Sequence, residues 1–202
     1  YKIGGFEAYM TSEVLQGSGL SSSAAFEVIV GTVLSGLYNQ MSIDPVTIAQ
    51  VGQYSENVYF GKPCGLMDQC ACSVGSLIHI DFKDNNHPIV EKVDVDFSQF
   101  EHSLCIVDVH ASHADLTDDY ASIPFEMKKV AEFFGKEFLR DVNEKDFYNQ
   151  LPEVRKATND RAVLRTIHLF EENKRVQKAV QALKENNFDV FKNTVKASGQ
   201  FV

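Results

Sequence analysis

The stretch Gly17-Ser18-Gly19-Leu20-Ser21-Ser22-Ser23-Ala24-Ala25 decides how this 202-residue sequence is interpreted. Two glycines flank a serine, three serines follow, and a helical apolar pattern starts at once. Glycine lets the backbone approach a ligand closely, and the unpaired N–H groups at the start of a helix favour an anion. Serine hydroxyls add donors, and one can ligate Mg²⁺. We therefore expect a phosphate site, the Gly/Ser loop, made by Gly17, Ser18, Gly19, Leu20, Ser21, Ser22 and Ser23.

A plain Gly/Ser turn with a capping serine is the alternative to this phosphate site. The loop is not a Walker loop, because no Gly-Lys-Ser/Thr follows it. The helix after it is apolar nearly all round, and only Glu27 interrupts it before Asn39. Such a helix is typical of the middle of a domain. Glycines on both sides, the serine triplet and this helix together favour the phosphate site.

The rest of the chain predicts an α+β protein with two domains, residues 1–97 and 98–202. A second helix should start at Asp44-Pro45, where an N-cap precedes a proline suited to the first turn. A polar turn between two apolar runs predicts a hairpin. The strands are expected at residues 2–15, 76–82, 89–95 and 104–109, and the helices of the second half at 118–134, 143 onward, 160 onward and 187–198.

Glu56 and Asp68 are the candidate carboxylates for chemistry, 12 residues apart. Both lie among apolar neighbours, and a carboxylate there costs free energy unless it is paired or binds a metal. One could hold Mg²⁺ while the other acts as general base toward a substrate hydroxyl. The alternative is a pair of partly exposed carboxylates at helix ends. The Gly/Ser loop upstream favours the catalytic interpretation.

Two other groups resemble metal sites only superficially. His110 and His113 follow the end of an expected strand and enter a loop, so their relative orientation is unspecified. The four cysteines, Cys64, Cys70, Cys72 and Cys105, form no Cys-x-x-Cys pair. We expect them to be buried thiols of a reducing compartment.

Charge and composition exclude several classes of protein. The net charge of −9 argues against coating a nucleic acid, although a local nest of amides can still bind a small anion. No apolar window is long enough to span a membrane, and we expect a cytoplasmic location. The sequence begins with Tyr1 rather than Met, and we expect it to be part of a longer polypeptide.

These motifs resemble the GHMP small-molecule kinases, and among them the galactokinases. The Gly/Ser loop is similar to their second motif, in the triple-serine form with Glu27-Val28 just after it. The run Pro63-Cys64-Gly65-Leu66-Met67-Asp68-Gln69 is similar to the segment with their catalytic aspartate. Residues 112–120 and 161–177 resemble their C-terminal domain. The resemblance covers nearly the whole chain.

The resemblance implies a fold and a set of roles. The fold is two-domain, with an N-domain like ribosomal protein S5 domain 2 and a ferredoxin-like C-domain, both incomplete here. Asp68 would be the base toward the C1 hydroxyl of galactose, and Ser23 and Glu56 would ligate Mg²⁺. The Gly/Ser loop would surround the phosphates of ATP, and Gly65 and Tyr120 would line the sugar pocket. Galactose, ATP and Mg²⁺ are thus the implied partners, and the oligomeric state is open.

Two family segments do not occur in this sequence: the N-terminal sugar-recognition motif and the Gly-rich third motif near the C-terminus. We therefore expect an incomplete kinase, inactive in this form. Sister kinases acting on N-acetylgalactosamine, arabinose or mevalonate are alternatives, since the segment that recognises the sugar is not present. A galactose-sensing regulator built on an inactive kinase is another, although the serine triplet and Asp68 are intact.

Overall fold

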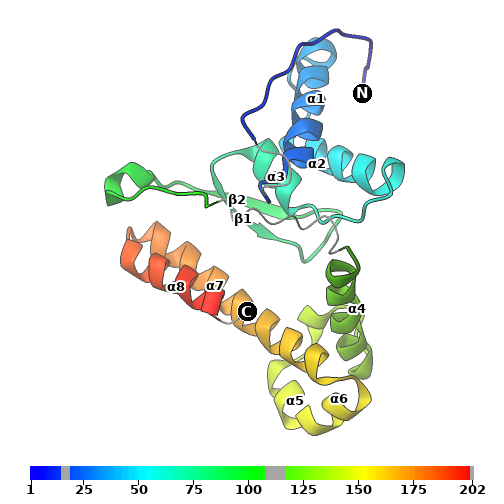
Figure 1. Ribbon diagram of the computed structural model, residues 1–202, viewed down its shortest axis with the longest axis vertical. Helices are drawn as coiled ribbons and strands as arrows, with labels where there is room; N and C mark the ends of the chain where they lie inside the picture. Colours follow the sequence, from blue (N-terminus) through cyan, green and yellow to red (C-terminus); the bar gives the residue numbers. More distant parts are fainter. Residues whose placement is uncertain (15–18, 108–116, 201–202) are drawn as a thin grey trace. The chain divides into compact units, whose positions relative to one another are not determined.

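The computed structural model describes residues 1–14, 19–107 and 117–200. The chain forms two compact units, Tyr1–Ala114 (unit 1) and Asp115–Val202 (unit 2), each described by itself (Figure 1). Helices dominate both, and the sheet of the described residues has two strands. None of the described helices is long and apolar enough to cross a membrane. The expected domains 1–97 and 98–202 stay a prediction about the longer protein.

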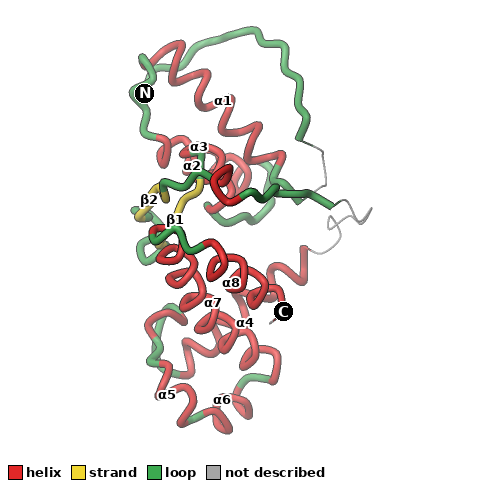
Figure 2. The backbone as a smooth tube through the Cα atoms, turned by 90° about the vertical axis from the view of Figure 1, so that its left-hand side faces the viewer, coloured by secondary structure: helices red, strands yellow, loops and turns green. Residues whose placement is uncertain are grey.

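The described residues of unit 1 form three α-helices, two short helices of other types and one hairpin. Figure 2 draws the helices in red and the hairpin strands in yellow. Strands β1 (Leu77–Asp81) and β2 (Ile89–Val93) pair antiparallel, with Leu77 opposite Val93, which confirms the expected hairpin. Ala49, Leu66 and Cys70 form the buried centre, and apolar side chains of the hairpin pack against it. The helices are α1 (Ser22–Asn39), α2 (Pro45–Tyr54) and α3 (Met67–Val74), followed later by the short 3₁₀ helix η2 (Phe97–Phe100).

Helix α2 begins as the sequence predicts. The side chain of Asp44 accepts a hydrogen bond from the backbone N–H of Thr47 at 3.1 Å, and Pro45 occupies the first turn. The last turn of this helical segment widens into the π-helix η1 (Ser55–Tyr59). A π-turn inserts one extra residue and changes the direction of the side chains after it. This local widening positions Glu56.

Helix α1 is less buried than its composition predicts. Ala24 and Val28 are buried against the rest of unit 1, but Phe26, Ile29 and Leu37 are 56%, 49% and 59% exposed. Helices α2 and α3 pack against α1, and together they cover one side of it. The expectation of a helix enclosed on all sides is therefore wrong for this chain, because an apolar surface is buried only where other elements cover it.

Two expected strands do not form in the described residues. Residues 1–14 and 102–107 have no regular structure, and residues 15 and 108–109 lie outside the described part. Leu104 is fully exposed, and Ile106 and Val107 are 65% and 79% exposed. A strand is held by hydrogen bonds to a neighbouring strand. Within the described chain only β1 and β2 supply such bonds, and they supply them to each other.

Unit 2 is helical throughout its described part, as the sequence predicts. Asn143 and Asn159 cap two of its helices with their side chains. Phe147, Val130 and Val154 lie at the centre of its core. The sheet expected of a ferredoxin-like domain stays a prediction. The elements are α4 (Thr117–Phe133), η3 (Leu139–Asp141), α5 (Glu144–Asn149), α6 (Leu151–Ala157), α7 (Asp160–Lys184) and α8 (Phe188–Gln200).

Candidate active site

The Gly/Ser loop enters helix α1 through two residues with left-handed backbone. Gly19 has φ +76°, which glycine adopts without strain. Ser21 has φ 54° and ψ 51° and occupies the N-cap position, but its hydroxyl makes no capping bond to the helix. That conformation costs a non-glycine residue on the order of 1 kcal/mol. The hydroxyl of Ser21 is thus directed elsewhere. Gly17 and Ser18 lie outside the described residues.

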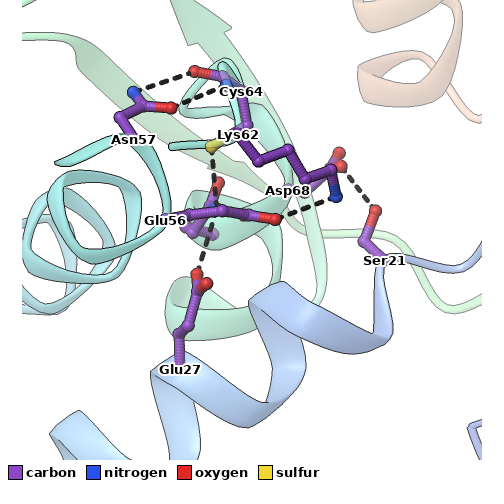
Figure 3. Close-up of polar contacts among 8 residues, drawn as sticks. Ser21, Glu27, Glu56, Asn57, Lys62, Cys64 and Asp68 are labelled. Carbon is purple, nitrogen blue, oxygen red and sulfur yellow. Dashed lines mark hydrogen bonds and ion pairs between the residues drawn. The ribbon is translucent and has the colours of Figure 1, made fainter. Parts of the chain in front are cut away.

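Asp68 accepts a hydrogen bond from the hydroxyl of Ser21. The Oγ atom of Ser21 donates a hydrogen bond to Oδ2 of Asp68 at 2.5 Å, across 47 residues of sequence (Figure 3). Asp68 is half-buried in the first turn of α3. Its other oxygen, Oδ1, has no hydrogen-bond partner among the described residues. The structure therefore brings the loop and the predicted base together.

Glu56 is the most buried carboxylate of unit 1, with 4% of its surface exposed. Its Oε1 atom pairs with Nζ of Lys62 at 2.9 Å, and its Oε2 atom accepts from Nε2 of Gln69 at 3.2 Å. Burial by itself raises the pKa of Glu56. The hydrogen bonds and charge of Lys62, with contributions from the side chains of Cys64 and Ser23, outweigh burial and hold the pKa below its ordinary value. The carboxylate is therefore ionised at neutral pH.

Gln69 joins this carboxylate to a second one. Its buried Nε2 atom donates to Oε2 of Glu27 at 3.2 Å as well as to Glu56, and it contacts the sulfur of Cys64 at 3.6 Å. Its Oε1 atom is buried with no hydrogen-bond partner among the described residues. Burial raises the pKa of Glu27, the bond from Gln69 opposes the rise, and the charge of Glu56 adds to it. Figure 3 shows Glu27 reaching this group from α1.

Close backbone approach lets helix α2 contact Glu27. A Cβ added to Gly52 would lie 3.2 Å from both Cβ and Oε2 of Glu27 and 3.4 Å from Cγ of Gln69. Only glycine leaves this space without displacing the neighbours. Glu27, Gln69 and Lys62 are residues of this site that the sequence motifs did not predict. Glu27 carried the clearest signal, as the single charge in an apolar helix.

Cys64 is fixed by its backbone rather than by its sulfur. Its N–H donates to Oδ1 of Asn57 at 2.7 Å, and its carbonyl accepts from the side chains of Asn57 and Gln53. These bonds hold residues 61–66 against η1 and α2. Burial, with the nearby carboxylate of Glu56, raises the pKa of the thiol to about 11, so the thiol is neutral at pH 7.

The other cysteines correct one expectation. All four are free thiols, but only Cys70 is buried, while Cys72 and Cys105 are exposed. The expectation of four buried thiols is therefore wrong, because Cys72 lies on the outer side of α3 and Cys105 belongs to a segment without regular structure. Among the described residues no group of three or more His, Cys, Asp or Glu could hold a metal. His110 and His113 lie outside the described residues.

Ser23 and Glu56 have the donor atoms that suit Mg²⁺. Ser23 lies close enough to lower the pKa of Glu56, so a hydroxyl and a carboxylate oxygen neighbour each other there. Mg²⁺ takes oxygen ligands and usually keeps several waters and substrate phosphates, with one or two carboxylates from the protein. The two side chains therefore fit that ion.

The predicted sugar-binding residues are not brought together by described contacts. Gly65 is exposed just before α3 in unit 1. Tyr120 lies in α4 of unit 2 and is 58% exposed. Their shared role in a galactose pocket stays a prediction.

Comparison with known proteins finds a matching family model and several similar proteins. Residues 1–76 match the GHMP kinases N terminal domain. The chain is 36% identical over 185 residues to the galactokinase of Glaesserella parasuis, covering 92% of this chain and 47% of that protein. It is 33% identical over 194 residues to the galactokinase of Pyrococcus furiosus, covering 94% and 50%. The chain thus spans about half the length of the curated relatives it matches.

A solved structure agrees in fold. The chain superposes on Lactococcus lactis galactokinase complexed with galactose with a TM-score of 0.69 at 23% identity, covering 92% of this chain and 47% of that one. The matched N-terminal domain includes the Gly/Ser loop, Glu56 and Asp68, and the similarity to galactokinases continues through unit 2. On these grounds residues 1–76 match the N-terminal domain of the GHMP kinases, and the chain as a whole is similar to about half of a galactokinase.

Proposed function

We propose that this chain is part of a galactokinase, which transfers the γ-phosphoryl group of ATP to the C1 hydroxyl of α-D-galactose. The observation that carries the proposal is the 2.5 Å hydrogen bond from Ser21 to Asp68, which joins the Gly/Ser loop to a carboxylate. A kinase requires such proximity, because its base must reach a hydroxyl that faces the bound phosphate. Galactose is proposed as the substrate because the curated relatives are named galactokinase.

Asp68 acts as the general base. Its Oδ2 atom is held by Ser21, which orients the carboxylate. Its Oδ1 atom accepts the proton of the C1 hydroxyl as the sugar oxygen bonds to the γ-phosphorus. The bond from that phosphorus to the β–γ bridging oxygen breaks, and ADP leaves. Alignment of these atoms supplies most of the catalysis in phosphoryl transfer.

The Gly/Ser loop stabilises the charge that develops on the phosphates. The backbone N–H groups of Gly19 to Ser22, at the start of α1, would donate to the phosphates, and the same role for Gly17 and Ser18 stays a prediction. Ser23 and Glu56 would hold Mg²⁺, and that ion would neutralise charge on the phosphates. Gly65 would contact the sugar, and the same role for Tyr120 stays a prediction from the resemblance.

A sugar panel with the full-length protein that contains this chain tests the proposal. ATP consumption is measured with galactose, N-acetylgalactosamine, arabinose and mevalonate, each as sole acceptor. The proposal requires galactose to have the highest kcat/KM and the product to be galactose 1-phosphate. A preference for another acceptor would assign the protein to a sister kinase, and galactose binding without turnover would assign it to a sensor.

A further inference from the structure

We propose that Lys62 is the resident counter-ion of the buried Glu56 carboxylate, and that a divalent cation binds Glu56 by displacing it. The inference rests on the proposed function in one respect, the assignment of Glu56 to the metal. It adds a competitor built into the chain itself, six residues from the ligand it blocks.

Both oxygens of Glu56 already have partners. Lys62 occupies Oε1 at 2.9 Å and Gln69 occupies Oε2 at 3.2 Å. Mg²⁺ binds carboxylate oxygen at about 2.0–2.1 Å. An ammonium group that stayed on the same carboxylate would lie only a few ångströms from the ion, and the two like charges would repel each other. The cation therefore repels the ammonium of Lys62 from Glu56 but does not repel the neutral amide of Gln69.

Lys62 is the partner that is able to leave. Gln69 is 1% exposed and also bonded to Glu27, so it has no path to solvent. The side chain of Lys62 is 65% exposed, compared with 6% for Glu56. A lysine ammonium on its flexible four-carbon stem is stable in water. Displacement of Lys62 therefore moves one exposed side chain and leaves the buried group intact.

The backbone around Lys62 is held in place, whereas most of its side chain is exposed to solvent. The N–H of Lys62 donates to the carbonyl of Glu56 at 3.1 Å. Gly61 before it has φ +68°, and Pro63 follows it. The turn is thus held by its own hydrogen bond and by restricted dihedrals. The fixed turn keeps the ammonium of Lys62 within reach of Glu56, so the ion pair forms again when the cation leaves.

Charge explains why such a counter-ion is present. Glu27 and Glu56 share one amide group of Gln69, and Lys62 is the cation that the structure pairs with Glu56. Without a cation, two neighbouring carboxylates would face each other beside buried apolar groups, which is costly. Lys62 keeps Glu56 ionised and ordered before the metal binds. The same contact weakens metal binding, because the ion must replace it.

The test measures the affinity of the full-length protein for Mn²⁺ without nucleotide. The concentration of free Mn²⁺ is read from its EPR signal. We expect Lys62→Met to bind Mn²⁺ at least fivefold more tightly than the parent, and Lys62→Arg to bind like the parent. Lys62→Gln should also bind more tightly, and it retains an amide donor if the methionine variant folds poorly. Lys83→Met removes an exposed lysine from the hairpin turn of the same unit and should change affinity less than twofold.

The increase in Mn²⁺ affinity must depend on Glu56. In Glu56→Gln, replacing Lys62 with Met should give no increase in Mn²⁺ affinity. Unchanged or weaker Mn²⁺ binding in folded Lys62→Met and Lys62→Gln would overturn the inference, as would the absence of an Mn²⁺ site in every variant. Failure of the two proposals is distinguishable. A protein that phosphorylates galactose while its Lys62 variants bind Mn²⁺ like the parent refutes the counter-ion alone, whereas tighter binding in a protein inactive on galactose refutes the substrate alone.

Discussion

Ser21 and Asp68 are hydrogen-bonded at 2.5 Å, and Ser21 makes this bond from a left-handed backbone conformation at the start of α1. The conformation is unfavourable for serine, and the hydroxyl does not cap the helix. The side chain of Ser21 therefore contacts the carboxylate of Asp68 and does not cap helix α1. This relationship connects the phosphate-binding and the proton-accepting parts of the proposed site.

Two substitutions of Ser21 separate the effect of its hydrogen bond to Asp68 from the effect of its strained backbone. Ser21→Ala loses the hydrogen bond and keeps the strained backbone, whereas Ser21→Gly loses the bond and relieves the strain. A hydrogen bond to a charged group contributes about 1.5 kcal/mol or more, so both variants of the full-length protein should lose about tenfold in kcat. In urea unfolding the glycine variant should be more stable than the alanine variant by about 1 kcal/mol. Equal kcat in parent and variants would show that the bond has no catalytic role.

Glu27 gives a pH-dependent prediction. Its pKa is raised in the folded protein, above the ordinary value of 4.5, with burial as the largest cause. The folded state then binds more protons than the unfolded state as pH rises above 4.5, so ionisation of Glu27 lowers stability over that range. Glu27→Gln keeps an oxygen acceptor for Gln69 and removes the charge.

Urea unfolding of the parent and of Glu27→Gln at pH 4 and pH 7 tests whether ionisation of Glu27 lowers the free energy of unfolding. The variant should gain stability relative to the parent on going from pH 4 to pH 7. The opposite is expected for Glu56→Gln, because the pKa of Glu56 is lowered and its ionised form is the stabilising one. A parallel pH dependence for all three proteins would contradict the assigned shifts.

Unit 2 has its own buried carboxylate, Glu126, which pairs with Arg161 at 2.6 Å and Arg165 at 2.7 Å. Removing one partner of a buried charge group leaves the others uncompensated, so Glu126→Gln should lower the free energy of unfolding by about 3 kcal/mol. Asp160→Asn is the control, since Asp160 pairs with Arg155 on the surface and such a pair contributes little. The measurement is urea denaturation at pH 7, and similar losses in both variants would contradict the structure.

The sequence predicted the elements that depend on local chemistry. The start of α1 at Ser22, the cap by Asp44 and the hairpin β1–β2 follow from turn residues and periodicity, and the structure confirms them. The contacts of Glu56 could not be predicted in this way. They depend on a π-turn, and on Gln69, whose bond to Glu27 spans 42 residues. Spacing alone does not determine such tertiary contacts.

The wrong expectations share one physical cause. The apolar patterns at residues 104–109 and around α1 show what the chain is able to bury. They do not show whether a covering element is present. Leu104 and Phe26 are exposed because none of the described elements covers them. The reverse holds for Lys62, whose contact with a buried carboxylate is not encoded in any periodicity.

The base assignment of Asp68 is the central claim, and Asp68→Asn in the full-length protein tests it most directly. The amide keeps an acceptor for Ser21 but cannot take up the proton of the sugar hydroxyl. We expect kcat for galactose phosphorylation to fall by at least 100-fold while Mg-ATP binding changes little. Asp94→Asn, at an exposed carboxylate of the same unit, should retain the parent kcat. An Asp68→Asn variant with turnover within a few-fold of the parent would contradict the account.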